Sequence, residues 1–99
     1  MPKFAVRVGG ENYRIGIVKR KWFRDRYQWK NAGFSTTRFV EAETANEAIE
    51  KVFEVVRSEL KEMGRTTKDS TLELEGVRED EEAFDLYAPG KGFTFSVEE

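Results

Sequence analysis

Apolar and polar residues alternate along most of the chain, and a period of two is typical of half-buried β-strands. The alternation over residues 3–8 predicts a first strand, and the glycine-rich residues 9–12 predict the turn of a hairpin. An extended, aromatic-rich stretch follows over residues 13–30, and the pattern leaves open whether it forms one strand or two. Residues 31–33 predict the next turn, before a strand over residues 34–43.

A single amphipathic helix over residues 45–63 is the most clearly specified element. Thr44 and Glu47 have the spacing of a capping box, and Gly64 stands where a left-handed residue commonly ends a helix. Apolar residues recur at spacings of three and four and form one stripe: Ala48, Ile49, Val52, Phe53, Val56, Leu60 and Met63. Since one helix cannot bury this stripe alone, a sheet is expected to cover it.

The segments after the helix predict more antiparallel strands. Residues 71–75 alternate, and the glycine that follows them marks the end of the strand or a bulge. The acidic residues 78–82 predict a solvated loop, and residues 84–88 and 93–97 alternate around a turn at 89–92, which predicts a last hairpin. The predicted fold class is therefore α+β, with a single helix packed on one face of a mainly antiparallel β-sheet and strands before and after it.

Length and composition limit the classes of protein that need to be considered. The 99 residues fit a single domain, residues 1–99, with one core. The chain has no cysteine and no histidine, so thiolate nucleophiles, zinc-thiolate sites and the commonest general base are excluded, and a non-enzymatic domain without metal or cofactor is expected. No apolar stretch approaches the roughly 20 residues of a membrane span, and the N-terminus lacks a signal-peptide core. A cytoplasmic protein that makes no membrane contact is expected.

Residues 40–48 resemble a stretch found in other proteins. They read Val-Glu-Ala-Glu-Thr-Ala-Asn-Glu-Ala, a strand that runs into a capped helix, and this stretch resembles one found in many small bacterial and phage α+β proteins. The antitoxin-like HicB group is among these proteins. Capping chemistry accounts for the nine similar residues, and the glycine-aspartate-threonine start typical of that group is absent, so membership does not follow.

Charge is divided unevenly along the chain. Residues 1–39 hold ten Lys or Arg against two Asp or Glu, whereas residues 40–99 hold seven against 17. The two parts carry +8 and −10, which the overall net charge of −2 conceals.

The basic and aromatic segment of residues 19–30 is the strongest candidate for a binding site. It holds six cationic residues, one anionic residue and four aromatic residues, including both tryptophans of the chain. Cations attract phosphates and aromatic rings stack on unpaired bases, so the segment predicts single-stranded nucleic acid as a partner. On one extended strand a single face would present Arg20, Trp22, Arg24, Arg26 and Lys30, with Trp22 as the stacking residue.

Two other interpretations of this segment stay open. In the first, the segment is an ordinary sheet strand whose cations lie across from Glu73 and Glu75, while Phe23, Tyr27 and Trp29 belong to the core or its edge. In the second, the basic and acidic parts form a protein interface, with a second copy in a homodimer or with a charged partner protein.

Overall fold

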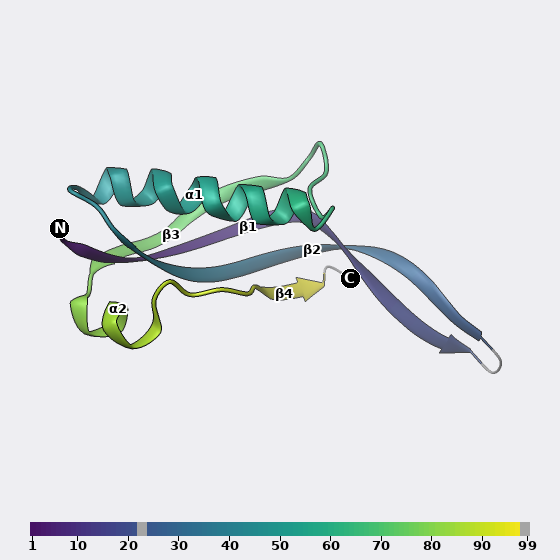
Figure 1. The fold of residues 1–99 in the computed structure, drawn as a ribbon. Coiled ribbons are helices and arrows are strands. Elements are labelled where there is room, and N and C mark those ends of the chain that lie inside the picture. Colours follow the sequence, from purple (N-terminus) through teal and green to yellow (C-terminus); the bar gives the residue numbers. More distant parts are fainter. Residues whose placement is uncertain (22–23, 98–99) are drawn as a thin grey trace.

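The structure is a computed structural model that describes residues 1–21 and 24–97, with the side chains of residues 17–27 outside the description. The described elements are, in chain order, β1 (Lys3–Lys21), β2 (Arg24–Glu41), α1 (Ala45–Glu62), β3 (Thr71–Glu79), α2 (Glu81–Tyr87) and β4 (Thr94–Val97). The four strands form one antiparallel sheet in the order β3-β1-β2-β4. Figure 1 shows α1 along one face of the sheet and α2 beside the other face at one end. The predicted α+β class is confirmed.

The core lies between α1 and the sheet. Alternate residues of β1 point towards the helix, and Val6 and Val8 are completely buried there. The stripe of α1 covers them, with Val56 and Leu60 also fully buried. The remaining members of the buried apolar cluster are Phe4, Tyr13, Phe34, Ala42, Ala48 and Val52. Burying this one contiguous cluster is the main stabilising contribution to the fold.

Both ends of α1 lie where the sequence predicted them, and of the capping box the bond to Thr44 is present, while the Glu47 carboxylate pairs with Lys51. The hydroxyl of Thr44 accepts a hydrogen bond from the backbone N–H of Glu47 at 3.2 Å, and Gly64 has a left-handed φ of 69° directly after the C-cap. The stripe prediction is wrong at Met63, which is 47% exposed because it lies at the cap, past the last helical turn that contacts the sheet. Neither described helix has the length and apolar character that crossing a bilayer requires.

The two turns predicted at residues 9–12 and 31–33 are not turns. Strands β1 and β2 run straight through them. Gly9 and Gly10 pair with residues 35 and 34, residues 31 and 32 pair with residues 14 and 13, and the register shifts at a bulge between Gly10 and Tyr13. Asn12 takes the positive φ of 64° that the bulge requires. Gly10 is needed for close approach, since a methyl group on its Cα would stand 2.3 Å from the Thr71 carbonyl oxygen and 2.6 Å from the Phe34 ring.

The prediction for residues 78–88 is also wrong. Strand β3 continues to Glu79, and Asp80 then starts α2 by accepting a hydrogen bond from the backbone N–H of Ala83 at 3.0 Å. Residues 84–88, predicted as a strand, therefore fall largely within a helix. The predicted last hairpin does not form because β4 pairs with residues 32–35 of β2 instead.

A buried arginine joins α1 to the sheet. The side chain of Arg38 is 5% exposed and forms an ion pair with Glu59 of α1. Its other N–H groups donate to the Thr36 hydroxyl at 3.0 Å and to the Gly92 carbonyl oxygen at 3.2 Å. The guanidinium also stands 5.0 Å from the ring centre of Phe93. This residue ties three segments of the chain together.

Candidate nucleic-acid interface

Strands β1 and β2 extend well past the other strands and form a two-stranded arm. Strand β3 pairs with β1 only over Phe4–Glu11, and β4 pairs with β2 only over Ala32–Ser35. From Arg14↔Asn31 to Lys21↔Arg24, the described pairings of these strands are with each other alone, whereas Ala32 pairs both with Tyr13 and with Val97 of β4. We call residues 13–32 the β-arm. Figure 1 shows it projecting from one end of the molecule, away from α2 and the N-terminus.

The base of the β-arm is held by the loop that follows α1. The backbone N–H of Arg14 donates to the Arg65 carbonyl oxygen at 2.9 Å, and the Arg14 side chain donates to the Gly64 carbonyl oxygen at 3.1 Å. The hydroxyls of Thr67 and Ser70 donate to the Asn12 carbonyl oxygen at 2.9 and 2.7 Å. These bonds lie beside the bulge, where the twist of a strand increases, and they fix the direction in which the β-arm leaves the sheet.

The β-arm is strongly basic, whereas the rest of the chain is acidic. Residues 13–32 hold seven cationic residues and one anionic residue, a net charge of +6. The remaining residues hold ten cationic residues against 18 anionic residues, a net charge of −8. The cationic residues of the β-arm are Arg14, Lys19, Arg20, Lys21, Arg24, Arg26 and Lys30. Folding thus gathers the basic part of the sequence into one projecting element.

The structure brings the predicted site residues together, but not on one strand. Arg20 is on β1, where its backbone pairs with Asp25, while Arg24, Arg26 and Lys30 are on β2 and pair with Lys21, Lys19 and Ile15. Trp22 lies outside the described residues, as do the side chains of Arg20, Arg24 and Arg26. Of the two possibilities that the sequence left open, one strand or two, the structure has two, since β1 ends at Lys21 and β2 begins at Arg24. The shared face expected for the one-strand case therefore does not apply.

The predicted neutralisation of these cations by β3 is wrong as well. Glu73 pairs with Gly9 in the middle of the sheet, and Glu75 lies at the bulge opposite Arg7 and Val8. Its carboxylate accepts a hydrogen bond from the Ser35 hydroxyl at 2.8 Å and stands 3.7 Å from Arg7 Nε. The acidic strand therefore ends before the β-arm begins, because β3 stops pairing at Glu11.

Trp29 and Arg14 form a cation–π contact at the base of the β-arm. Trp29 was predicted to belong to the core or its edge, but its side chain is 58% exposed. The Arg14 guanidinium stands 4.7 Å from the centre of its ring. Sequence reasoning missed Arg14 because that residue lies outside the segment 19–30. The signal that would have found it is the position of the chain reversal, which pairs residue 14 with residue 31.

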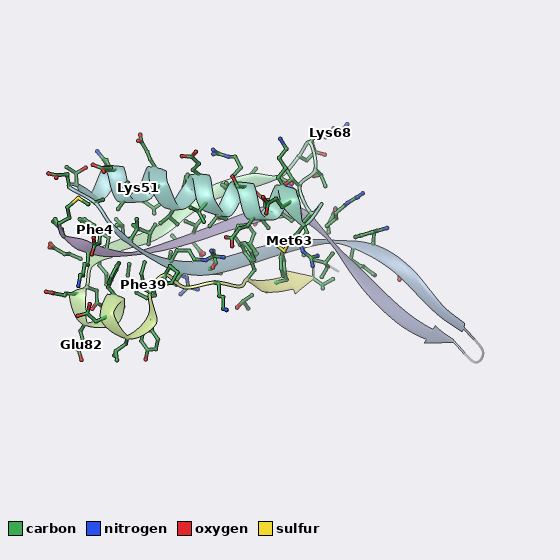
Figure 2. The ribbon with its side chains drawn as sticks, in the orientation of Figure 1. Phe4, Phe39, Lys51, Met63, Lys68 and Glu82 are labelled. Atoms are coloured by element: carbon green, nitrogen blue, oxygen red, sulfur yellow. The ribbon has the colours of Figure 1, made fainter. Side chains whose placement is uncertain are left out.

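Carboxylates gather at the opposite end of the molecule. Residues 41–47 and 79–85 hold eight acidic residues and no cationic residue. The first strand brings the two segments together, since Lys3 pairs with Glu41 and the next residue, Phe4, with Glu79. Glu82 lies at this end in Figure 2, far from the β-arm. A hydrogen bond of 2.7 Å from Lys3 to Asp85 raises the pKa of Lys3 above its usual value.

A second group of polar side chains lies on the sheet itself. On the face of the sheet opposite α1, Arg7 Nε donates to the Ser35 hydroxyl at 3.1 Å, and this hydroxyl donates in turn to Glu75. Within the part of the chain that the structure describes, no three acidic side chains gather as a metal site would need. The β-arm thus remains the feature that calls for a functional explanation.

Comparisons of the chain with protein-family models, with curated proteins and with solved structures give no match.

Proposed function

We propose that this protein is a non-enzymatic nucleic-acid-binding domain and that the β-arm is its binding element. The observation that carries the proposal is the projection of a strand pair with a net charge of +6 from a body with a net charge of −8. Cationic side chains along such an element attract phosphates without regard to sequence. The acidic strand β3 stops pairing with β1 at Glu11, before the β-arm begins, so Glu73 and Glu75 do not lie across from its cations.

The charge separation along the molecule also supports this proposal. The acidic end repels a polyanion, while the β-arm at the other end attracts it. A nucleic acid that approaches the protein is therefore expected to contact the β-arm before the body. This favours rapid association in one orientation. In this proposal Arg20, Arg24, Arg26 and Lys30 contact phosphates, and Trp22 contacts a base or sugar.

A charge-reversal experiment tests the proposal. The change is Arg24→Glu with Arg26→Glu, and the measurement is the binding of labelled DNA and RNA by fluorescence anisotropy at low and high salt. We expect wild-type binding that weakens steeply with salt, and a loss of at least about 100-fold in the variant, because two attractive phosphate contacts become repulsive.

The matched control is Arg57→Glu with Lys91→Glu. Both residues are exposed and lie outside the β-arm, and the double change alters the net charge by the same amount. Affinity within about threefold of wild type is expected for this control, since charges on the body are screened over about 10 Å at 0.1 M salt. Equal losses in both variants, or no wild-type binding at low salt, would contradict the proposal.

The alternative is a charged protein interface, and the acidic end of the molecule favours it. The eight carboxylates of residues 41–47 and 79–85 offer a complementary surface for the β-arm of a second copy. Such a contact joins different surfaces of the two copies, so it is heterologous and can continue from copy to copy. Its test is the oligomeric state of the pure protein.

A further inference from the structure

We infer that the ligand of the β-arm is double-stranded DNA in the B-form and that the β-arm lies in its major groove. This inference rests on the proposed nucleic-acid-binding function and makes it more specific. It starts from the fact that the basic residues sit on two paired strands rather than on one. A strand pair is a ribbon of fixed width, and the groove that receives it must match that width.

The width of the ribbon selects among the nucleic-acid forms. Two paired strands are about 4.8 Å apart, and side chains extend the ribbon on both faces. The major groove of B-form DNA is about 12 Å wide and admits a two-stranded ribbon, whereas the minor groove is only about 6 Å wide. The major groove of A-form RNA is deep and too narrow for side chains to read.

The position of the charges along the β-arm matches the depth of the same groove. The last three described pairs, from Lys19↔Arg26 to Lys21↔Arg24, hold five cationic residues and one Asp. The first and the last of these pairs are two residue steps apart, about 6.6 Å at the usual rise of 3.3 Å per residue, which is within the depth of that groove. The major groove is about 8.5 Å deep, so a β-arm that enters it tip first brings these residues level with the phosphates and base edges.

Two features at the base of the β-arm agree with entry from the tip. The hydrogen bonds from Arg14, Thr67 and Ser70 fix the β-arm relative to the body, so the orientation of the body sets the orientation of the β-arm. Arg14 stands over the Trp29 ring, so this aromatic residue already has a cation on its π-face. Stacking of unpaired bases, the main contact in single-strand binding, is therefore less favoured at Trp29.

The first test compares ligands of one sequence and length. Labelled duplex DNA, duplex RNA and single-stranded DNA are titrated with the full chain at 0.05 and 0.2 M salt, with Arg24→Glu/Arg26→Glu and Arg57→Glu/Lys91→Glu as variant and control. We expect duplex DNA to bind at least about tenfold more tightly than either other ligand. Equal or tighter binding of single strands or duplex RNA would overturn the inference but leave the proposed function intact. Absence of binding to all three ligands would overturn both.

The second test identifies the groove. Duplex DNA whose cytosines carry glucosylated hydroxymethyl groups has its major groove filled, while distamycin fills the minor groove of an AT-rich duplex. Glucosylation should weaken binding at least about tenfold, and distamycin should change it less than about twofold, if the ribbon enters the major groove. The reverse pattern would place the β-arm in the minor groove and overturn the inference.

Discussion

Arg38 holds a full positive charge in the interior, where a cation is stable only with its partners in place. Glu59 supplies the opposite charge, and its side chain is 38% exposed, so water still reaches the carboxylate. The guanidinium has little such contact. Arg38 is therefore the more deeply buried of the two charges. Removing the Glu59 carboxylate destabilises the fold mainly because it leaves this buried cation without an anion.

We predict that Glu59→Ala lowers the free energy of unfolding by about 2–4 kcal/mol, because it leaves the buried Arg38 charge without its anion. Urea denaturation followed by tryptophan fluorescence measures the change. The matched control is Glu47→Ala, which removes an exposed carboxylate 3.1 Å from Lys51 on the same helix. That change should cost less than about 1 kcal/mol. Similar losses in the two variants would show that burial of Arg38 is not the cause.

At the scale of elements, the β-arm depends on how its base is anchored. Tyr13 is the first residue of the β-arm and is 3% exposed, with its ring 5.0 Å from that of Phe34. Its hydroxyl donates a hydrogen bond of 2.9 Å to the Thr71 carbonyl oxygen of β3. This bond links the β-arm to the edge of the sheet, and burial raises the pKa of Tyr13.

We predict a stability difference between wild type and Tyr13→Phe that depends on pH. The raised pKa of Tyr13 means that the folded state favours the neutral phenol. The stabilisation by the Tyr13 hydroxyl is therefore fully present below the pKa of about 10 that tyrosine has in the unfolded chain, and it is lost as pH rises through the pKa in the folded state. Wild type should exceed the variant by about 1 kcal/mol at pH 7 and lose this advantage above about pH 10.

Urea denaturation at pH 7, 9 and 10.5 measures this difference. Tyr87→Phe is the control for removing a hydroxyl, since Tyr87 is 66% exposed. At pH 7 this change should lower the free energy of unfolding by less than about 0.5 kcal/mol. A wild-type advantage over Tyr13→Phe that does not change between pH 7 and 10.5 would contradict the prediction.

At the scale of the whole molecule, charge is separated along the longest dimension of 55 Å. The basic β-arm lies at one end and the carboxylates of residues 41–47 and 79–85 at the other. This arrangement attracts polyanions to the arm, and it also attracts one copy of the protein to another. The two outcomes compete for the same cations, so salt and nucleic acid are expected to shift the balance between them.

The charged-interface alternative predicts self-association at low salt. Sedimentation at about 0.02 M salt should give a mass that exceeds a monomer and grows with concentration, and at about 1 M salt, where screening extends only about 3 Å, a monomer. Arg24→Glu/Arg26→Glu should abolish the association, while Arg57→Glu/Lys91→Glu should not. A monomer under every condition would remove the self-association form of the alternative.

The sequence by itself determined the features that depend on neighbouring residues. The limits of α1 follow from Thr44 and Gly64, because capping is a contact between residues a few positions apart. The alternation of apolar and polar residues located most of the strand segments, because α1 buries one face of the sheet and the residues of each strand point alternately to that face and away from it. The basic segment 19–30 was likewise visible as composition, although its shape was not.

Tertiary structure decided what each interruption of the pattern means. Glycines permit turns, bulges and close packing alike. Only the pairing of Gly9 and Gly10 with Ser35 and Phe34, together with the carbonyl of Thr71 beside Gly10, made this segment part of a bulged strand pair. Residues 84–88 are too few for their periodicity to separate strand from helix, and packing of α2 beside Lys3 decided it. The β-arm exists because β3 and β4 end early, a property of partner strands that no local pattern records.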